Sequence, residues 1–195
     1  MSAMLLLARL LGFINSVLGR IGQALSVTAI GLMVVVILIQ VFCRYVLNNA
    51  LPWPDEAARF LMLWLTGLMA PVALRQGGFV AIDTLKLALP SRATSILSLV
   101  LLVMTLAILV VAVQLGANHV KSGWLFASSS LKVPLDLLGM KPVKIKLAWS
   151  FLSLYVGVWL MIIVSVELIL REIITILGSG DKLHDIPDLN TQGVS

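Results

Sequence analysis

The chain has 195 residues, of which 60% are hydrophobic and only 12% are charged, with a net charge of +5. A soluble domain carries about 25% charged residues, so this composition excludes a soluble enzyme, a disordered regulator and a nucleic-acid-binding module. A membrane-crossing helix needs about 20 apolar residues, so four such helices nearly fill the chain. We therefore expect an all-α polytopic membrane protein with a single membrane domain over residues 1–178.

The segment that precedes the first apolar stretch is itself apolar on one side. Hydrophobic residues recur at helical spacing from Leu7 to Ile21, and Arg9 and Arg20 lie on the opposite side. This pattern is typical of a short amphipathic helix that lies in the membrane interface. An extension of the first span on its water side fits equally well, so the sequence leaves both interpretations open.

Four stretches are apolar enough to cross a membrane, and they cover residues 21–43, 57–74, 93–120 and 147–166. Glu167, Arg171 and Glu172 are expected to close the last span, and residues 179–195 to form a flexible cytoplasmic tail. Basic residues divide seven against seven between the two sides of the membrane. The positive-inside rule is therefore undecided, with a weak preference for cytoplasmic termini from the first span.

The connection between the first two spans carries charges of both signs at one depth. Arg44 ends the first span, and Asp55 and Glu56 follow Pro54 at an expected helix start. Proline suits the first helical position, and carboxylates suit the positive end of the helix dipole. Arg59 lies within one turn of both carboxylates. We expect a neutral four-member cluster of Arg44, Asp55, Glu56 and Arg59 at one membrane face.

Aromatic and small residues mark the surroundings of the expected spans. Tyr45, Trp53 and Trp64 fit an interfacial belt. Small side chains that allow close helix approach are Thr66, Gly67, Ala70, Ala112, Gly116, Ser150, Ser153 and Gly157. We interpret them first as contacts inside a four-helix bundle, with packing against another chain as the alternative.

The third connection, residues 121–146, is the longest and most basic, with five lysines and one acid, Asp136. Pro134, Gly139 and Pro142 exclude a long helix there. The chain has one cysteine, Cys43, and two histidines, so we expect no disulfide, metal or cofactor and no catalytic group. These features indicate an accessory membrane subunit. A membrane anchor of a redox complex and an independent small carrier stay open as alternatives.

A set of residues between the first and third spans forms a recognisable pattern: Arg44, Tyr45, Val46, Asn48, Trp53, Glu56, Ala58, Arg59, Trp64, Ala73, Leu74, Arg75, Gly77, Gly78 and Asp83. This pattern resembles the signature of a known family, the DctQ-type small permeases of tripartite ATP-independent periplasmic (TRAP) transporters. The match covers about residues 35–90 well and the later half in pattern. The chain departs from the family pattern at Phe79, where the family often has histidine, and in the lysine-rich Lys141–Lys146 stretch.

The resemblance implies that the chain works with two partners, a large membrane subunit and a periplasmic substrate-binding protein. The large subunit would carry the substrate and sodium sites, and the substrate would be a carboxylate. The small subunit would brace the large one, with both termini in the cytoplasm and lipids around its spans. Structural or partner-interface candidates are Arg44, Tyr45, Trp53, Asp55, Glu56, Arg59, Trp64, Arg75 and Asp83. Lys141, Lys144 and Lys146 are candidates for docking the binding protein by charge steering, with contact to lipid headgroups as the alternative.

Overall fold

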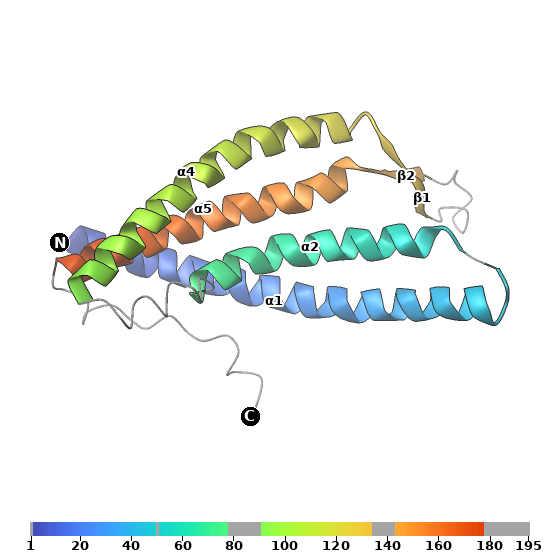
Figure 1. Ribbon diagram of the computed structural model, residues 1–195, viewed down its shortest axis with the longest axis horizontal. Helices are drawn as coiled ribbons and strands as arrows, with labels where there is room; N and C mark the ends of the chain where they lie inside the picture. Colours follow the sequence, from blue (N-terminus) through green and yellow to red (C-terminus); the bar gives the residue numbers. More distant parts are fainter. Residues whose placement is uncertain (1, 50, 78–90, 134–142, 178–195) are drawn as a thin grey trace, which may run out of the picture.

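In the computed structural model, the residues described are 2–49, 51–77, 91–133 and 143–177 (Figure 1). Their elements are α1 (Ser2–Tyr45), α2 (Trp53–Arg75), α4 (Ser91–Gly123), β1 (Ala127–Val133), β2 (Val143–Lys146) and α5 (Ala148–Ile176). Each of these four helices is long and apolar enough to cross a membrane. The expected all-α polytopic architecture is confirmed, and the antiparallel pair β1–β2 is an addition that the sequence did not predict.

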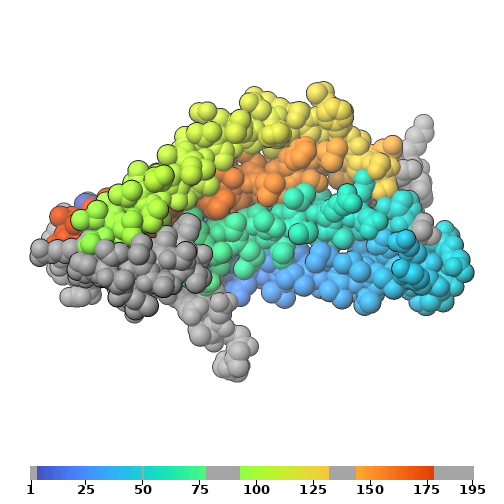
Figure 2. Space-filling model, viewed as in Figure 1, coloured from blue at the N-terminus to red at the C-terminus, as the bar shows by residue number. Residues whose placement is uncertain are grey.

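Over most of their length the four helices form a row rather than a closed bundle. α1 packs on α2, α2 on α5, and α5 on α4, and the N-terminal half of α1 also contacts α5. Figure 2 shows the helices as successive bands across one face of the molecule. The expectation of a bundle is therefore wrong in its arrangement, although the helices do pack within the chain. Inside a bilayer no hydrophobic force closes a row on itself, because lipid tails cover apolar side chains as well as a neighbouring helix does.

α1 is one continuous helix of 44 residues, about 66 Å long at 1.5 Å per residue. The N-terminal segment is therefore not a separate interfacial helix but an extension of the first span, the second of the two interpretations. The reason lies on its small-residue face, which packs inward and is buried at three- and four-residue spacing. The buried positions are Ala8, Gly12, Asn15, Gly19, Gly22 and Ser26. Leu7, Leu10 and Ile21 of the apolar face are exposed instead.

α2 and α5 approach each other most closely at their middle. A Cβ added to Gly157 would lie 2.5 Å from the carbonyl oxygen of Gly67, and one added to Gly67 would lie 2.4 Å from that of Ser153. We call these three residues the Gly67 crossing. Gly116 of α4 similarly faces the ring of Tyr155 at 3.0 Å from its would-be Cβ. The small residues expected to mediate packing at these positions do so inside this chain.

α5 continues ten residues beyond the expected end of the last span at residue 166, to Ile176. The charges that were expected to close the span are accommodated within the helix, because Glu167 is paired and buried. α2 also continues through Pro71 to Arg75. The C-terminal ends of α2 and α5 share one end of the row, the Glu167 end. The start of α2 and the β1–β2 hairpin lie at the other, the Glu56 end (Figure 1).

Candidate functional site

A group of polar side chains lies where α1, α2 and α5 meet. At its centre the side chain of Glu167 is fully buried. Its Oε2 accepts hydrogen bonds from Asn15 Nδ2 (2.6 Å) and Arg75 Nε (3.0 Å). Its Oε1 accepts from Arg75 Nη2 (3.0 Å) and Arg171 Nε (3.0 Å). Each carboxylate oxygen thus accepts two hydrogen bonds, and the donors come from three helices.

Arg75 connects this carboxylate to the backbone of α1. Its Nη1 donates to Ser16 Oγ and its Nη2 to the carbonyl of Gly12, both at 2.9 Å. Gly12 leaves room for this contact, since a Cβ there would lie 3.1 Å from Glu167 Oε1. We call the six residues the Glu167 cluster: Gly12, Asn15, Ser16, Arg75, Glu167 and Arg171. Only 5% of the Arg75 side chain is exposed.

The Glu167 cluster fixes which residues of the three helices face one another. A buried ion costs several kcal/mol unless its charge and hydrogen bonds are matched. Here Glu167 can meet that requirement only when Arg75 and Asn15 stand at its level. The cluster therefore sets the register of α1 and α2 against α5, and a shift of one helix along another would leave a charge unpaired.

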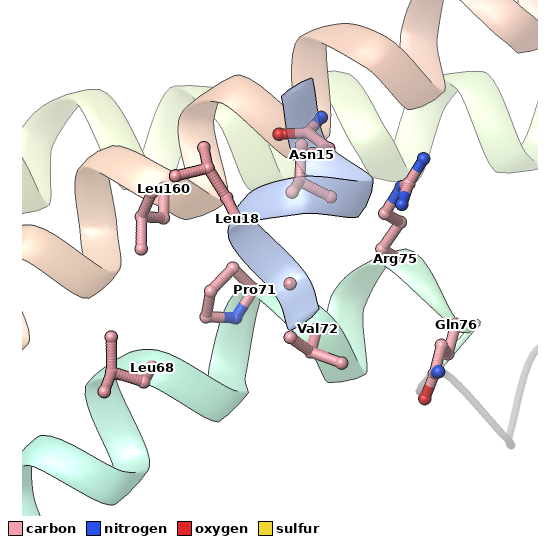
Figure 3. A pocket seen from close by; sticks show the side chains of 10 residues that line it. Asn15, Leu18, Leu68, Pro71, Val72, Arg75, Gln76 and Leu160 are labelled. Carbon is pink, nitrogen blue, oxygen red and sulfur yellow. The ribbon is translucent and has the colours of Figure 1, made fainter. Parts of the chain in front are cut away.

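A small cavity of about 20 Å³ lies beside the cluster, between the same three helices. In Figure 3, Asn15 and Arg75 border it at one end, and Leu68, Pro71 and Val72 line it along α2. This volume holds about one water molecule, so the cavity is too small for an organic acid. Among the described residues, no group of three or more His, Cys, Asp or Glu side chains could hold a metal ion.

At the opposite end of the row, the carboxylate of Glu56 is bound by the start of β1. Backbone amides of Ser129 (3.2 Å), Ser130 (2.9 Å) and Leu131 (2.9 Å) donate to it. The hydroxyls of Ser128, Ser129 (2.7 Å) and Ser130 (2.6 Å) also lie within hydrogen-bond distance. We call this arrangement the Glu56 latch: Glu56 with residues 128–131. It joins the first turn of α2 to the connection between α4 and α5.

The predicted cluster of four charges at this end does not form. Of the ion pairs within the described residues, none joins Arg44 or Arg59 to Asp55 or Glu56. Asp55 instead accepts a hydrogen bond from Gln40 Nε2 at 2.9 Å, and Arg44 lies over the ring of Tyr45. The physical reason is the latch. The serine donors satisfy Glu56 without a cation, and Arg44 and Arg59 are exposed.

The remaining predicted residues are placed as follows. Trp53 stands at the start of α2, whereas Trp64 lies 11 residues further on, about 16 Å along the helix, so the two are not at one depth. Lys144 and Lys146 are exposed on β2, with Lys146 Nζ 5.4 Å from the centre of the Trp124 ring. Asp83 and Lys141 lie outside the described residues, as do the expected tail and the residues around Phe79.

Two features were missed from the sequence, although each left a signal. Spans two and four run in the same direction, so their ends share one side, and there Arg75 and Glu167 carry opposite charges. An ion pair between these two residues could have been predicted by comparing the depth of each charge in the membrane, instead of only counting the charges on each side. The Ser128–Ser129–Ser130 run offers clustered donors, but nothing in the sequence connects it to Glu56.

The comparison with protein families gives one match. The family described as "Tripartite ATP-independent periplasmic transporters, DctQ component" matches residues 33–175. This range is more than half of the chain and runs from the second half of α1 to near the end of α5. No curated protein matches the chain.

Proposed function

The chain belongs to the DctQ component family of tripartite ATP-independent periplasmic transporters, and we propose that it braces the large membrane subunit of a transporter for an organic acid. The observation that supports this role is the low burial of its apolar helices. Only 6% of the apolar window of α1 is buried inside the chain, and 28% of that of α5, the highest share among the four helices described. Because most of the apolar surface of these helices is not buried within the chain, the row has two broad apolar faces on which a larger partner can pack.

The proposed role requires a rigid row, and three contacts on α2 support it. Glu56 holds the hairpin, Gly67 meets α5 at mid-length, and Arg75 ties α1 to α5. Polar contacts at both ends and a tight crossing between them restrain α2 against sliding and tilting. The large subunit would carry the substrate and sodium sites and move against this fixed row, and the chain would have no enzymatic activity of its own.

The orientation belongs to the same proposal. We place the protein in the bacterial inner membrane with both termini in the cytoplasm. The Glu167 end then faces the cytoplasm and the Glu56 end faces the periplasm. The Lys144 and Lys146 strand would stand where a periplasmic binding protein docks, and the carboxylate substrate would reach the large subunit from there.

The test is reconstitution with the neighbouring gene products. The chain, tagged, is co-expressed with the large permease and the exported binding protein encoded beside it, and uptake into liposomes is measured with a panel of labelled dicarboxylates and sugar acids. We expect co-purification with the large subunit and sodium-dependent uptake only when all three proteins are present. Uptake by this chain alone indicates an independent carrier, and a haem absorbance band in the purified chain indicates a redox anchor. Either result contradicts the proposal.

A further inference from the structure

The β1–β2 hairpin depends on the Glu56 latch for its position. Two strands alone are marginally stable in water, and the register of this pair is interrupted between Ala127 and Lys132. The hairpin is therefore not arranged for its own stability, and an external contact has to hold it.

The irregular register of the hairpin exposes the groups that make this contact. Between the pairs Ala127–Lys146 and Lys132–Lys144, β1 advances five residues while β2 advances two. The extra residues on β1 include Ser129 to Leu131, whose amides donate to Glu56. The bulge and the latch are thus one feature.

We propose that Glu56 is the positioning residue of a docking surface, which holds the hairpin on α2 so that Lys144 and Lys146 meet an acidic face of the binding protein. The inference rests on the proposed function and adds to it the residue that controls the docking surface. Both lysines are exposed on one strand, and the Nζ of Lys146 also donates to the carbonyl of Trp124 at 3.2 Å, which fixes its position. Such a pair of cations is complementary to a carboxylate-rich surface.

The position of the hairpin favours a soluble protein over lipid as the partner. Figure 1 shows the strands at one end of the helix row, past the end of α4 and the start of α5 and beside the start of α2. Lipid headgroups reach the flanks of a membrane protein, whereas a water-soluble protein approaches along the helix axes. A further contact holds the hairpin at this end of α2, since Ser130 Oγ lies 3.0 Å from the carbonyl of Pro52, immediately before α2.

The first experiment compares Glu56→Gln with Asp55→Asn in the complete reconstituted complex, using the acid that the wild type transports best. Glutamine turns an amide NH₂ toward a site made of donors, so the latch opens, while the Gly67 crossing and the Glu167 cluster still hold the helices. We expect the concentration of binding protein at half-maximal uptake to rise at least about fivefold, with the maximal rate within about twofold of wild type. Asp55→Asn, whose hydrogen bond goes to Gln40, leaves both values unchanged.

A rescue separates positioning from a general structural role. In a Cys43→Ser background, Pro52→Cys and Ser130→Cys are joined by a short bifunctional maleimide in the Glu56→Gln variant. We expect the half-maximal concentration to return toward the wild-type value. If Glu56→Gln does not assemble, Ser129→Ala with Ser130→Ala removes two hydroxyls of the latch, and the same shift is expected.

Three results overturn the inference while leaving the proposed function intact. The first is an unchanged half-maximal concentration although hydrogen exchange shows the amides of residues 129–131 released. The second is a fall in maximal rate alone. The third is a Lys144→Glu, Lys146→Glu variant whose defect follows the anionic lipid content of the liposomes instead of the binding protein concentration. Loss of uptake in the wild-type complex contradicts the proposed function instead.

Discussion

At the scale of single residues, the negative charges of two carboxylates, Glu167 and Glu56, are stabilised in different ways. Glu167 is neutralised by arginines within the helix row, whereas Glu56 is held by backbone amides and hydroxyls without a cation. The first solution suits a site surrounded by apolar helices, where an unpaired charge is costly. The second suits the end of the row, where a carboxylate next to polar backbone is already partly solvated.

Glu167→Gln tests the first solution. It leaves Arg75 buried beside a neutral partner, and removing one member of a buried pair costs about 3–5 kcal/mol. We expect the thermal midpoint of the purified subunit in mild detergent to fall by roughly 10 °C. Arg20→Ala, which removes an exposed arginine of the same helix α1, serves as the control and should shift the midpoint little. Equal midpoints for the two variants contradict a stabilising role of the cluster.

The sequence allowed some of these residues to be predicted and hid the roles of others. Arg75, Glu56 and Asp55 were identified as interface or structural candidates, but their partners were not. Helical spacing can relate Asp55 to Arg59 because they share a helix. It cannot relate Glu56 to serines 72–74 positions away, because that contact depends on how the chain returns to α2 after α4.

At the scale of elements, small residues decide which helix face turns inward. α1 buries glycine, serine and asparagine and exposes leucine and isoleucine, the reverse of a soluble helix. This inversion arises because lipid is as apolar as leucine, so burying a leucine against another helix gains little free energy. Close approach of two helix backbones gains more, through van der Waals contact. It also explains why the apolar periodicity of residues 7–21 pointed to an interfacial helix: the large side chains mark the face away from the protein.

Gly157→Ala tests the close approach of α2 and α5. The added methyl group would lie 2.5 Å from a backbone oxygen of α2, which cannot move aside as a side chain can, so the helices must separate. Overpacking of this kind costs about 1–3 kcal/mol, which should appear as a lower thermal midpoint and weaker assembly with the large subunit.

Gly31→Ala is the matched control for this substitution. It also replaces a helical glycine in an apolar span, but its Cβ would meet nothing within 4 Å. Because alanine favours the helix by about 1 kcal/mol over glycine, this variant should be as stable as the wild type or slightly more so. A Gly157→Ala variant that matches Gly31→Ala would show that the crossing tolerates more space than its geometry indicates.

At the scale of the whole molecule, successive helices run in alternating directions, so that the α1–α2 connection and the hairpin lie at the same end (Figure 1). The class of fold and the four crossing helices could be predicted because apolar length alone determines them. The open row could not be predicted, since periodicity shows which residues pack but not whether four helices close into a ring. Whether they close depends on how much of each helix surface is covered by lipid or by a partner instead of by another helix of the chain.

Cysteine labelling tests the proposed orientation. In a Cys43→Ser background, single cysteines at Asn49 and Leu125 mark the Glu56 end, and single cysteines at Gln76 and Leu177 mark the Glu167 end. A membrane-impermeant maleimide added to cells with a permeable outer membrane should label the first two and spare the others until the inner membrane is broken. Labelling in the reverse pattern would place the termini in the periplasm and remove the basis for docking at Lys144 and Lys146.

The Arg75–Glu167 pair also has a consequence for how the chain is made. The two residues are 92 positions apart, so at 5–20 residues per second roughly 5–20 s separate their synthesis. During that interval Arg75 has emerged from the ribosome and its counter-charge does not yet exist. Among the helices described, the one that carries Glu167 is made last, and its arrival completes the pairing of the second helix and of the N-terminal half of the first. The pairing of these charges is therefore expected in one late step, so that nascent chains lacking α5 are the ones that quality-control proteases can recognise.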